Sequence, residues 1–397
     1  MSVINNHNDI IKQWMAVKCV LKGVSPYSLT LNILDTKIGP VKAKTINLWE
    51  IRGYIDRSSE EQGLCRPTDT TYSPAALGFM TLSVGAFDKD YHVVVGWFVL
   101  NMLALACIVR SKTMRLLDGG GSWFGVNKSL LVFVTFFPVV FALQIGQFSL
   151  LVLAGVLSAL DNEESPMIAG FSMFMMLLKP TLGVPLLALF PIKRYWRAIS
   201  FALVLCLLSS LAVALLTHVG ILELYRQWFG VGWYYGWNKT WSMQADVAWF
   251  VKYLLLATAL VAVWLSRMTY GRAGVALSGA FACLWTYTQY YDYVLCLPFF
   301  TYILSGCHGV GRTGIIDPVM SFARKVAMCL FWVLSLCSLA SSVIVMQIIT
   351  EGWGVLRSVK DFSLVVLLAL LLMLLGTGVW EKKVNKRSIV GEVRSHG

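Results

Sequence analysis

Charged residues are scarce in this chain of 397 residues: they make up 14% of it, whereas about 25% of a soluble domain is Asp, Glu, Lys or Arg. Hydrophobic residues make up 57%. A soluble fold would leave much of that apolar surface in water, so soluble enzyme folds are excluded as the main body. The composition predicts an integral membrane protein.

The spacings of cysteine and histidine that hold metals are also missing. No CxxC and no HxxxH pair occurs. Six of the nine cysteines lie in apolar runs, which is typical of small buried hydrophobes. Only Cys19 and Cys65 share an aqueous segment, so one disulfide there stays open. We predict no metal site from these residues, and the sequence leaves open whether a divalent cation assists.

Residues 1–92 lack any apolar run long enough to cross a bilayer, and no signal peptide begins at Met1. The rest of the chain predicts an all-α, polytopic bundle at 93–380, followed by a basic tail at 381–397. Its eleven apolar segments lie at roughly 93–109, 129–143, 148–160, 167–178, 182–192, 198–217, 247–266, 274–288, 291–305, 326–349 and 362–379. Several are shorter than the ~20 residues of a full span.

The short segments come in pairs that meet at polar residues. Gln144 to Gln147 separate the second and third segments, Lys179 and Pro180 the fourth and fifth, and Gln289 to Asp292 the eighth and ninth. Each pair is interpreted as a hairpin whose tip ends in or near the membrane surface. Such tips need protein or water around their backbone, so three tips on one side predict a shared polar cavity.

The net charge of +12 carries information about topology. If all eleven segments cross, seventeen basic residues fall in the loops and tail of one side and five in the short loops opposite. Because basic loops stay in the cytoplasm, we expect the C-terminus inside, and the three tips and residues 1–92 outside. Export of residues 1–92 would need a leading helix, so we expect a further transmembrane helix before Met1. The alternative is unaided translocation of this segment.

Residues 8–22 combine apolar positions at helical spacing with lysines elsewhere. We interpret them as an amphipathic helix, capped by Asn8 and suited to lying on a membrane surface. Asp9 falls in the first turn, where the helix dipole favours an ionised carboxylate. Such a carboxylate is a candidate general base. The alternative is that Asp9 only supports the start of the helix.

Two cations are candidate ligands for a phosphate. Lys179 lies at a hairpin tip after an apolar run, where a charge needs a partner. An anionic lipid phosphate would serve; the alternatives are snorkelling to water or pairing with Asp292 or Asp9. Arg226 lies in an outer loop, 218–244, that is dense in aromatics and also holds Asn238 and Gln244. This loop is interpreted as a carbohydrate or lipid cleft, or as an interfacial anchor.

The residues from Asn8 to about Pro298 resemble a family, the GT-C membrane glycosyltransferases, and within them glycosyltransferase family 87. The order and spacing of several short motifs carry the resemblance: Asp9 with Gly23 and Pro26-Tyr27, Tyr72-Ser73-Pro74, Gly146-Gln147, Gly170 with Leu178-Lys179-Pro180, Lys193 to Arg197, and Gln289 to Tyr293 before Pro298. The sequence departs from the family in two places. The helix that normally precedes the Asp loop is absent, and the last tip has no His.

The resemblance implies an inverting hexosyltransferase that takes a sugar, mannose, from a polyprenyl phosphate and passes it to a lipid or glycan acceptor. Asp9 would be the base, and Lys179 and Arg226 would bind the donor phosphate. The lining of the cavity would comprise Asn8, Tyr27, Tyr72, Gln147, Asn238, Gln244, Gln289, Tyr290 and Asp292. The expected location is the cell membrane, with the active site facing the periplasm or the exterior.

Two other functions stay open. A lipid or sugar transporter would show internal repeats and intramembrane acid-base relays, and neither is evident. A polymerase or ligase of surface polysaccharide would use Arg and His in a large outer loop, for which Arg226 and His218 are candidates. A nucleic-acid partner is discarded, because the basic residues are spread over cytoplasmic loops and the tail.

Overall fold

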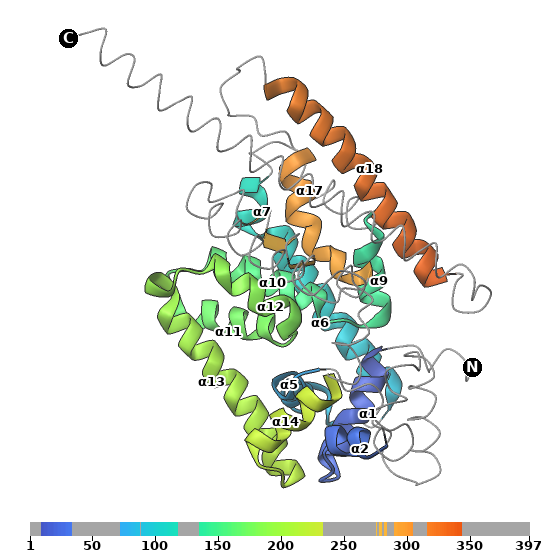
Figure 1. Cartoon of the computed structure of the whole chain (residues 1–397), viewed down its shortest axis with the longest axis vertical. Coiled ribbons are helices and arrows are strands. Elements are labelled where there is room, and N and C mark those ends of the chain that lie inside the picture. The colour runs from blue at the N-terminus through green and yellow to red at the C-terminus, as the bar shows by residue number, and fades with distance from the viewer. Residues whose placement is uncertain are drawn as a thin grey trace.

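The computed structural model describes residues 9–33, 72–87, 89–117, 135–232, 275, 278–279, 282–283, 290–304 and 316–343. All regular secondary structure in these ranges is helical, and no strand occurs in them (Figure 1). The all-α prediction is confirmed for this part of the chain. The predicted segments 247–266 and 362–379, the tail 381–397 and most of residues 34–71 lie outside the described residues.

The bounds of the described helices are α1 (Asp9–Leu21), α2 (Pro26–Ile33), α5 (Pro74–Val84), α6 (Asp90–Arg110), α7 (Lys112–Leu117), α9 (Phe137–Ile145), α10 (Ser149–Asp161), α11 (Pro166–Leu177), α12 (Pro180–Leu186), η3 (Leu187–Leu189), α13 (Ile192–Thr217), α14 (Ile221–Gly232), η5 (Tyr290–Cys296), α17 (Leu297–Leu304) and α18 (Ile316–Val343). α10 and α11 begin and end within one residue of the predicted limits of their apolar segments, whereas α9 begins later and α13 and α18 begin earlier than predicted. The segments predicted at 148–160, 167–178 and 198–217 correspond to α10, α11 and α13.

Two described helices are long and apolar enough to span a membrane: α13, and the part of α6 from Tyr91 to Arg110. The 26 residues of α13 extend about 39 Å, against about 30 Å of hydrocarbon. This helix exposes Leu203, Leu207 and Leu215. Exposed leucines on a helix of this length indicate contact with lipid. The full count of eleven segments stays a prediction.

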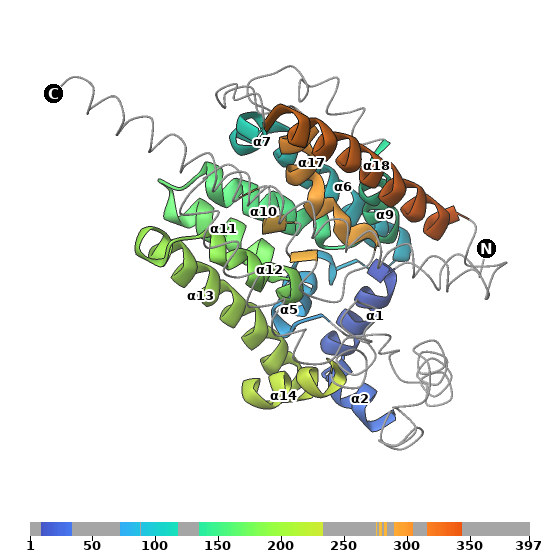
Figure 2. The ribbon, with the colours of Figure 1, turned by 45° about the horizontal axis from the view of Figure 1, so that its top comes forward.

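The short helices pack beside the long ones. α11 lies between α10 and α13, α5 packs on α13, and α6 contacts α10 (Figures 1 and 2). α9, α17 and α18 group beyond η5. α1 packs against α5 and α6, so Ile10, Trp14 and Val17 are buried against protein. The sequence predicts that this amphipathic helix lies on the membrane surface. In the structure its apolar face packs against other helices instead.

Three loops that the alternation of segments places on one side meet at one end of the bundle. Both carboxylate oxygens of Asp161, at the end of α10, accept hydrogen bonds from the backbone N–H groups of Lys112 and Thr113, each at 2.8 Å. Arg194, at the start of α13, forms an ion pair with Glu163. The carboxylate of Asp161 thus caps α7 from another helix.

Glycines allow α10, α11 and α13 to approach closely. A Cβ on Gly155 would lie 2.5 Å from the carbonyl oxygen of Ser172, and one on Gly170 would lie 2.7 Å from that of Ala198. Small residues at helix contacts are typical of membrane bundles, where close packing replaces the hydrophobic driving force. These two contacts fix α11 between its neighbours.

We predict that Gly155→Ala and Gly170→Ala lower stability, because backbone atoms must move to admit the methyl group. A cost of about 1–3 kcal/mol is expected for each. The measurement is the apparent melting temperature of the purified protein in detergent. The control is Gly220→Ala, because a Cβ on Gly220 would meet nothing within 4 Å. Equal melting temperatures for all three variants would contradict the prediction.

Candidate active site

The three hairpin tips predicted from the sequence converge on one carboxylate. Lys179 Nζ lies 2.5 Å from Asp292 Oδ1. Ser149 Oγ donates a hydrogen bond to the same oxygen, and Lys179 Nζ lies 3.4 Å from Ser149 Oγ. These residues belong to the tips before α10, before α12 and at the start of η5. These contacts bring residues of the three tips together, and the shared polar cavity stays a prediction.

The local sequence explains how each tip turns. α9 ends at Gly146, whose φ of 77° lies in the left-handed region that glycine adopts without strain. α11 ends before Lys179, and Pro180 occupies the first turn of α12, where its missing N–H is not needed. The first two tips therefore reverse the chain within a few residues and leave polar side chains at the reversal.

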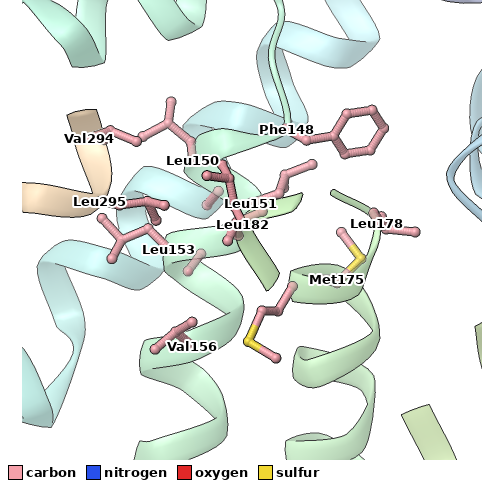
Figure 3. Packing of buried hydrophobic residues seen from close by; sticks show 14 of the residues in the cluster. Phe148, Leu150, Leu151, Leu153, Val156, Met175, Leu178, Leu182, Val294 and Leu295 are labelled. Atoms are coloured by element: carbon pink, nitrogen blue, oxygen red, sulfur yellow. The ribbon is translucent and has the colours of Figure 1, made fainter. Parts of the chain in front are cut away.

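The ion pair at this site is buried. The side chain of Asp292 is 1% exposed and that of Lys179 is 13% exposed. Phe148, Leu178 and Val294, which lie next to or near these polar residues in the sequence, are buried in the hydrophobic core (Figure 3). In such surroundings one charge without the other would be costly.

A second set of hydrogen bonds joins the first tip to α5 and α2. Tyr72 donates its hydroxyl proton to Gln147 Oε1 at 2.5 Å, and Tyr27 donates to the backbone oxygen of Tyr72 at 2.8 Å. Burial raises the pKa of Tyr27 well above its ordinary value, so this phenol stays protonated and serves as a donor. Tyr72 and Gln147 are therefore joined by a hydrogen bond, and Tyr27 holds the backbone of Tyr72 by a second one.

α5 is tied directly to the Lys179 tip through Ser73. Its Oγ accepts a hydrogen bond from the backbone N–H of Ala76 at 3.2 Å and so caps α5. The same hydroxyl donates to the carbonyl oxygen of Leu178 at 3.4 Å. One serine thus connects the start of α5 with the residue before Lys179.

The start of α1 lies against the first tip. A Cβ added to Gly146 would lie 2.8 Å from Cβ of Ile10 and 3.1 Å from Trp97 Cδ1. Only glycine therefore admits this contact between the tip, α1 and α6. Asp9, the predicted base, is the first residue of α1 and precedes Ile10. The predicted base and the tips thus belong to one region of the molecule.

Other predicted site residues lie apart from the tips or outside the described residues. Arg226 is exposed on α14 and forms an ion pair with Glu223 at 2.8 Å. Within the described ranges no hydrogen bond or ion pair joins it to the tips. Tyr290 begins η5. Asn8, Asn238, Gln244 and Gln289 lie outside the residues that the structure describes.

Ser149 belongs to the site and was not among the predicted residues. It follows Gln147 by two positions, so its place at the first tip was a signal for it. Cys283 was also missed: its Sγ donates to the backbone oxygen of Asp292 at 3.4 Å. Nothing in its apolar surroundings in the sequence pointed to that contact. Among the described side chains, no group of three His, Cys, Asp or Glu could hold a metal ion.

An all-helical apolar bundle with membrane-length helices, and with polar tips gathered around a buried cation, defines a membrane protein with an internal polar site. The chain belongs to glycosyltransferase family 87, whose model matches residues 71–298, more than half of its length. It is accordingly a membrane glycosyltransferase. No curated protein matches it. No solved structure matches it either.

We predict that Lys179→Met and Asp292→Asn each destabilise the protein, because each leaves an uncompensated charge in an apolar shell. The expected loss is about 3–5 kcal/mol per single variant, and less for the double variant, in which neither charge remains. Apparent melting temperatures in detergent measure the three effects. The control is Lys22→Met, since Lys22 is exposed. Additive losses in the double variant would contradict the pairing.

Proposed function

We propose that this protein transfers a hexose, mannose, from a polyprenyl-phosphate sugar to a lipid or glycan acceptor at the outer face of the cell membrane, with inversion at the sugar. The observation that carries the proposal is the convergence of three tips on Lys179, beside the start of α1 where Asp9 stands. A cation and a carboxylate are the two groups that such a transfer needs.

The reaction proceeds by direct displacement. The acceptor hydroxyl oxygen attacks C1 of the sugar from the face opposite the phosphate, and Asp9 takes its proton. The bond between C1 and the phosphate oxygen breaks, and its electron pair leaves with the polyprenyl phosphate. Lys179 stabilises the negative charge that grows on this leaving group. The reaction forms one glycosidic bond and breaks one glycosyl phosphate bond.

We assign different roles to Asp292 and Asp9. Asp292 accepts hydrogen bonds from Lys179 and Ser149 and is 1% exposed. Its Oδ1 is therefore already engaged by two groups of the protein, and we assign Asp292 a structural role. Asp292 orients the Lys179 ammonium toward the site. This leaves Asp9, at the first turn of α1, as the base.

The donor is lipid-linked because the site lies among helices that face the membrane. α13 exposes leucines, α11 packs against α13, and α10 packs against the other side of α11. A sugar on a polyprenyl phosphate reaches such a site from within the bilayer. The choice of mannose rests on the resemblance to polyprenyl-phosphate-mannose-dependent members of the family.

Two observations support the outer face. The basic residues are concentrated in the loops opposite the tips, as the positive-inside rule requires. In addition, Cys19 of α1 forms a disulfide, whereas the other cysteines with described side chains are free thiols. Disulfides form and persist in oxidising compartments and are rare in the cytosol. α1 therefore belongs on the extracytoplasmic side.

Asp9→Asn tests the base. Because an amide cannot take the acceptor proton, we expect transfer to fall by at least about 100-fold while the protein stays folded. The assay follows radiolabelled mannose from decaprenyl phosphate mannose into membrane lipids and glycans. Glu223→Gln is the control, since it removes a carboxylate on α14 far along the chain from Asp9. Wild-type turnover by Asp9→Asn would refute the assignment.

Lys179→Met tests the phosphate contact in the same assay. Loss of the cation should raise the KM for the donor and lower kcat, together about 100-fold in kcat/KM, because the leaving phosphate is no longer stabilised. Lys179→Arg should retain part of the activity, since it keeps the charge. A Lys179→Met variant with unchanged donor KM and kcat would count against the assignment.

A further inference from the structure

Gln13 of α1 is a buried polar residue whose hydrogen-bonding capacity is unused. Its side chain is 3% exposed, and neither Nε2 nor Oε1 has a hydrogen-bond partner among the described residues. Buried amides in proteins nearly always find partners, because a group removed from water otherwise loses its hydrogen bonds without replacement. An apolar side chain of the same size would avoid that cost at this position.

Gln13 lies near the proposed base in α1. It follows Asp9 by four residues within α1, and residues so spaced lie on the same face of a helix, one turn apart. Ile10, between them, touches Gly146 at the first tip. Gln13 is therefore one helical turn from the proposed base, on the helix whose Ile10 meets the first tip.

The indole N–H groups of two tryptophans near Gln13 are also buried without a hydrogen-bond partner in the described part of the chain. Trp97 of α6 meets Ile10 at Gly146, and Trp14 follows Gln13 in α1. Both indole N–H groups are buried without a hydrogen-bond acceptor among the described residues. α1 and α6, which are in contact, thus carry buried donors and an amide oxygen without a partner among the described residues.

We propose that Gln13 binds a hydroxyl group of the transferred sugar, with Trp97 as a neighbouring donor. A hydroxyl both donates and accepts, so it can satisfy Oε1 and Nε2 of an amide, which a purely apolar or purely anionic ligand cannot. Aromatic side chains beside such an amide suit the apolar faces of a sugar ring. The inference rests on the proposed function and identifies a residue that recognises the sugar.

The test combines an apolar variant with donors that lack single hydroxyls. Gln13→Met keeps the length of the side chain and removes its polar atoms, and Gln13→Leu is a second apolar variant. The donors are decaprenyl phosphate mannose and its 2-, 3-, 4- and 6-deoxy analogues. Transfer is measured for each protein with each donor, and the apparent melting temperature is recorded in parallel.

We expect the wild type to lose about 10- to 100-fold in kcat/KM with one of the deoxy donors, because the Gln13 amide then stays unpaired. Gln13→Met should lose a similar factor with the complete donor and should no longer discriminate against that deoxy donor. Its melting temperature should be equal to that of the wild type or higher, since a buried polar group without a protein partner has been removed. A purely structural glutamine would not produce this coupling.

Ser335→Ala is the matched control. Its hydroxyl is also buried without a hydrogen-bond partner among the described residues, but it lies on α18, which packs against α9 and α17. Its removal should leave the discrimination between donors unchanged.

The inference is overturned if both Gln13 variants discriminate among the donors as the wild type does, or if they transfer mannose at the wild-type rate. The second result would show that internal water satisfies the amide. A wild type that transfers from none of the five donors, although folded, would instead overturn the proposed function. The two failures are therefore distinguishable in one experiment.

Discussion

The ion pair between Lys179 and Asp292 is the interaction on which the arrangement of the site depends. A lysine and an aspartate are tolerated in an apolar shell only when each neutralises the other. Their pairing ties the tip before α12 to the start of η5, and Ser149 adds the tip before α10. Three chain reversals that are distant in the sequence are held at one point by one charge pair and one hydroxyl.

The surrounding helices are built to bring these reversals together. α10, α11 and α12 are too short to cross a bilayer, so their ends fall within the depth of the longer α13. Glycines at the contacts of α11 let it lie close to both neighbours, and this fixes the height of the tips. Short helices are therefore the means by which polar residues reach the interior of an apolar bundle.

Some polar groups near the site are paired within the protein, and one buried amide has no partner among the described residues. Asp292 is committed to Lys179, and Tyr72 is committed to Gln147. The amide of Gln13 is a polar group without a partner among the described residues, and it lies one turn beyond Asp9. Groups that are satisfied hold the shape of the site, whereas the unsatisfied amide offers binding capacity to a ligand. The proposed sugar contact uses this division.

Composition and local pattern by themselves determined the membrane class, the helical fold, the limits of α10 and α11 and the end of α13, because apolar runs and turn residues act over short distances. They also indicated the polar tips. Only the tertiary structure decided that Lys179 pairs with Asp292, 113 positions away, since the sequence left several partners open. It also decided that α1 packs against helices rather than lipid, and that Gln13 is buried without a partner. Such outcomes depend on how separate helices pack, which no local pattern contains.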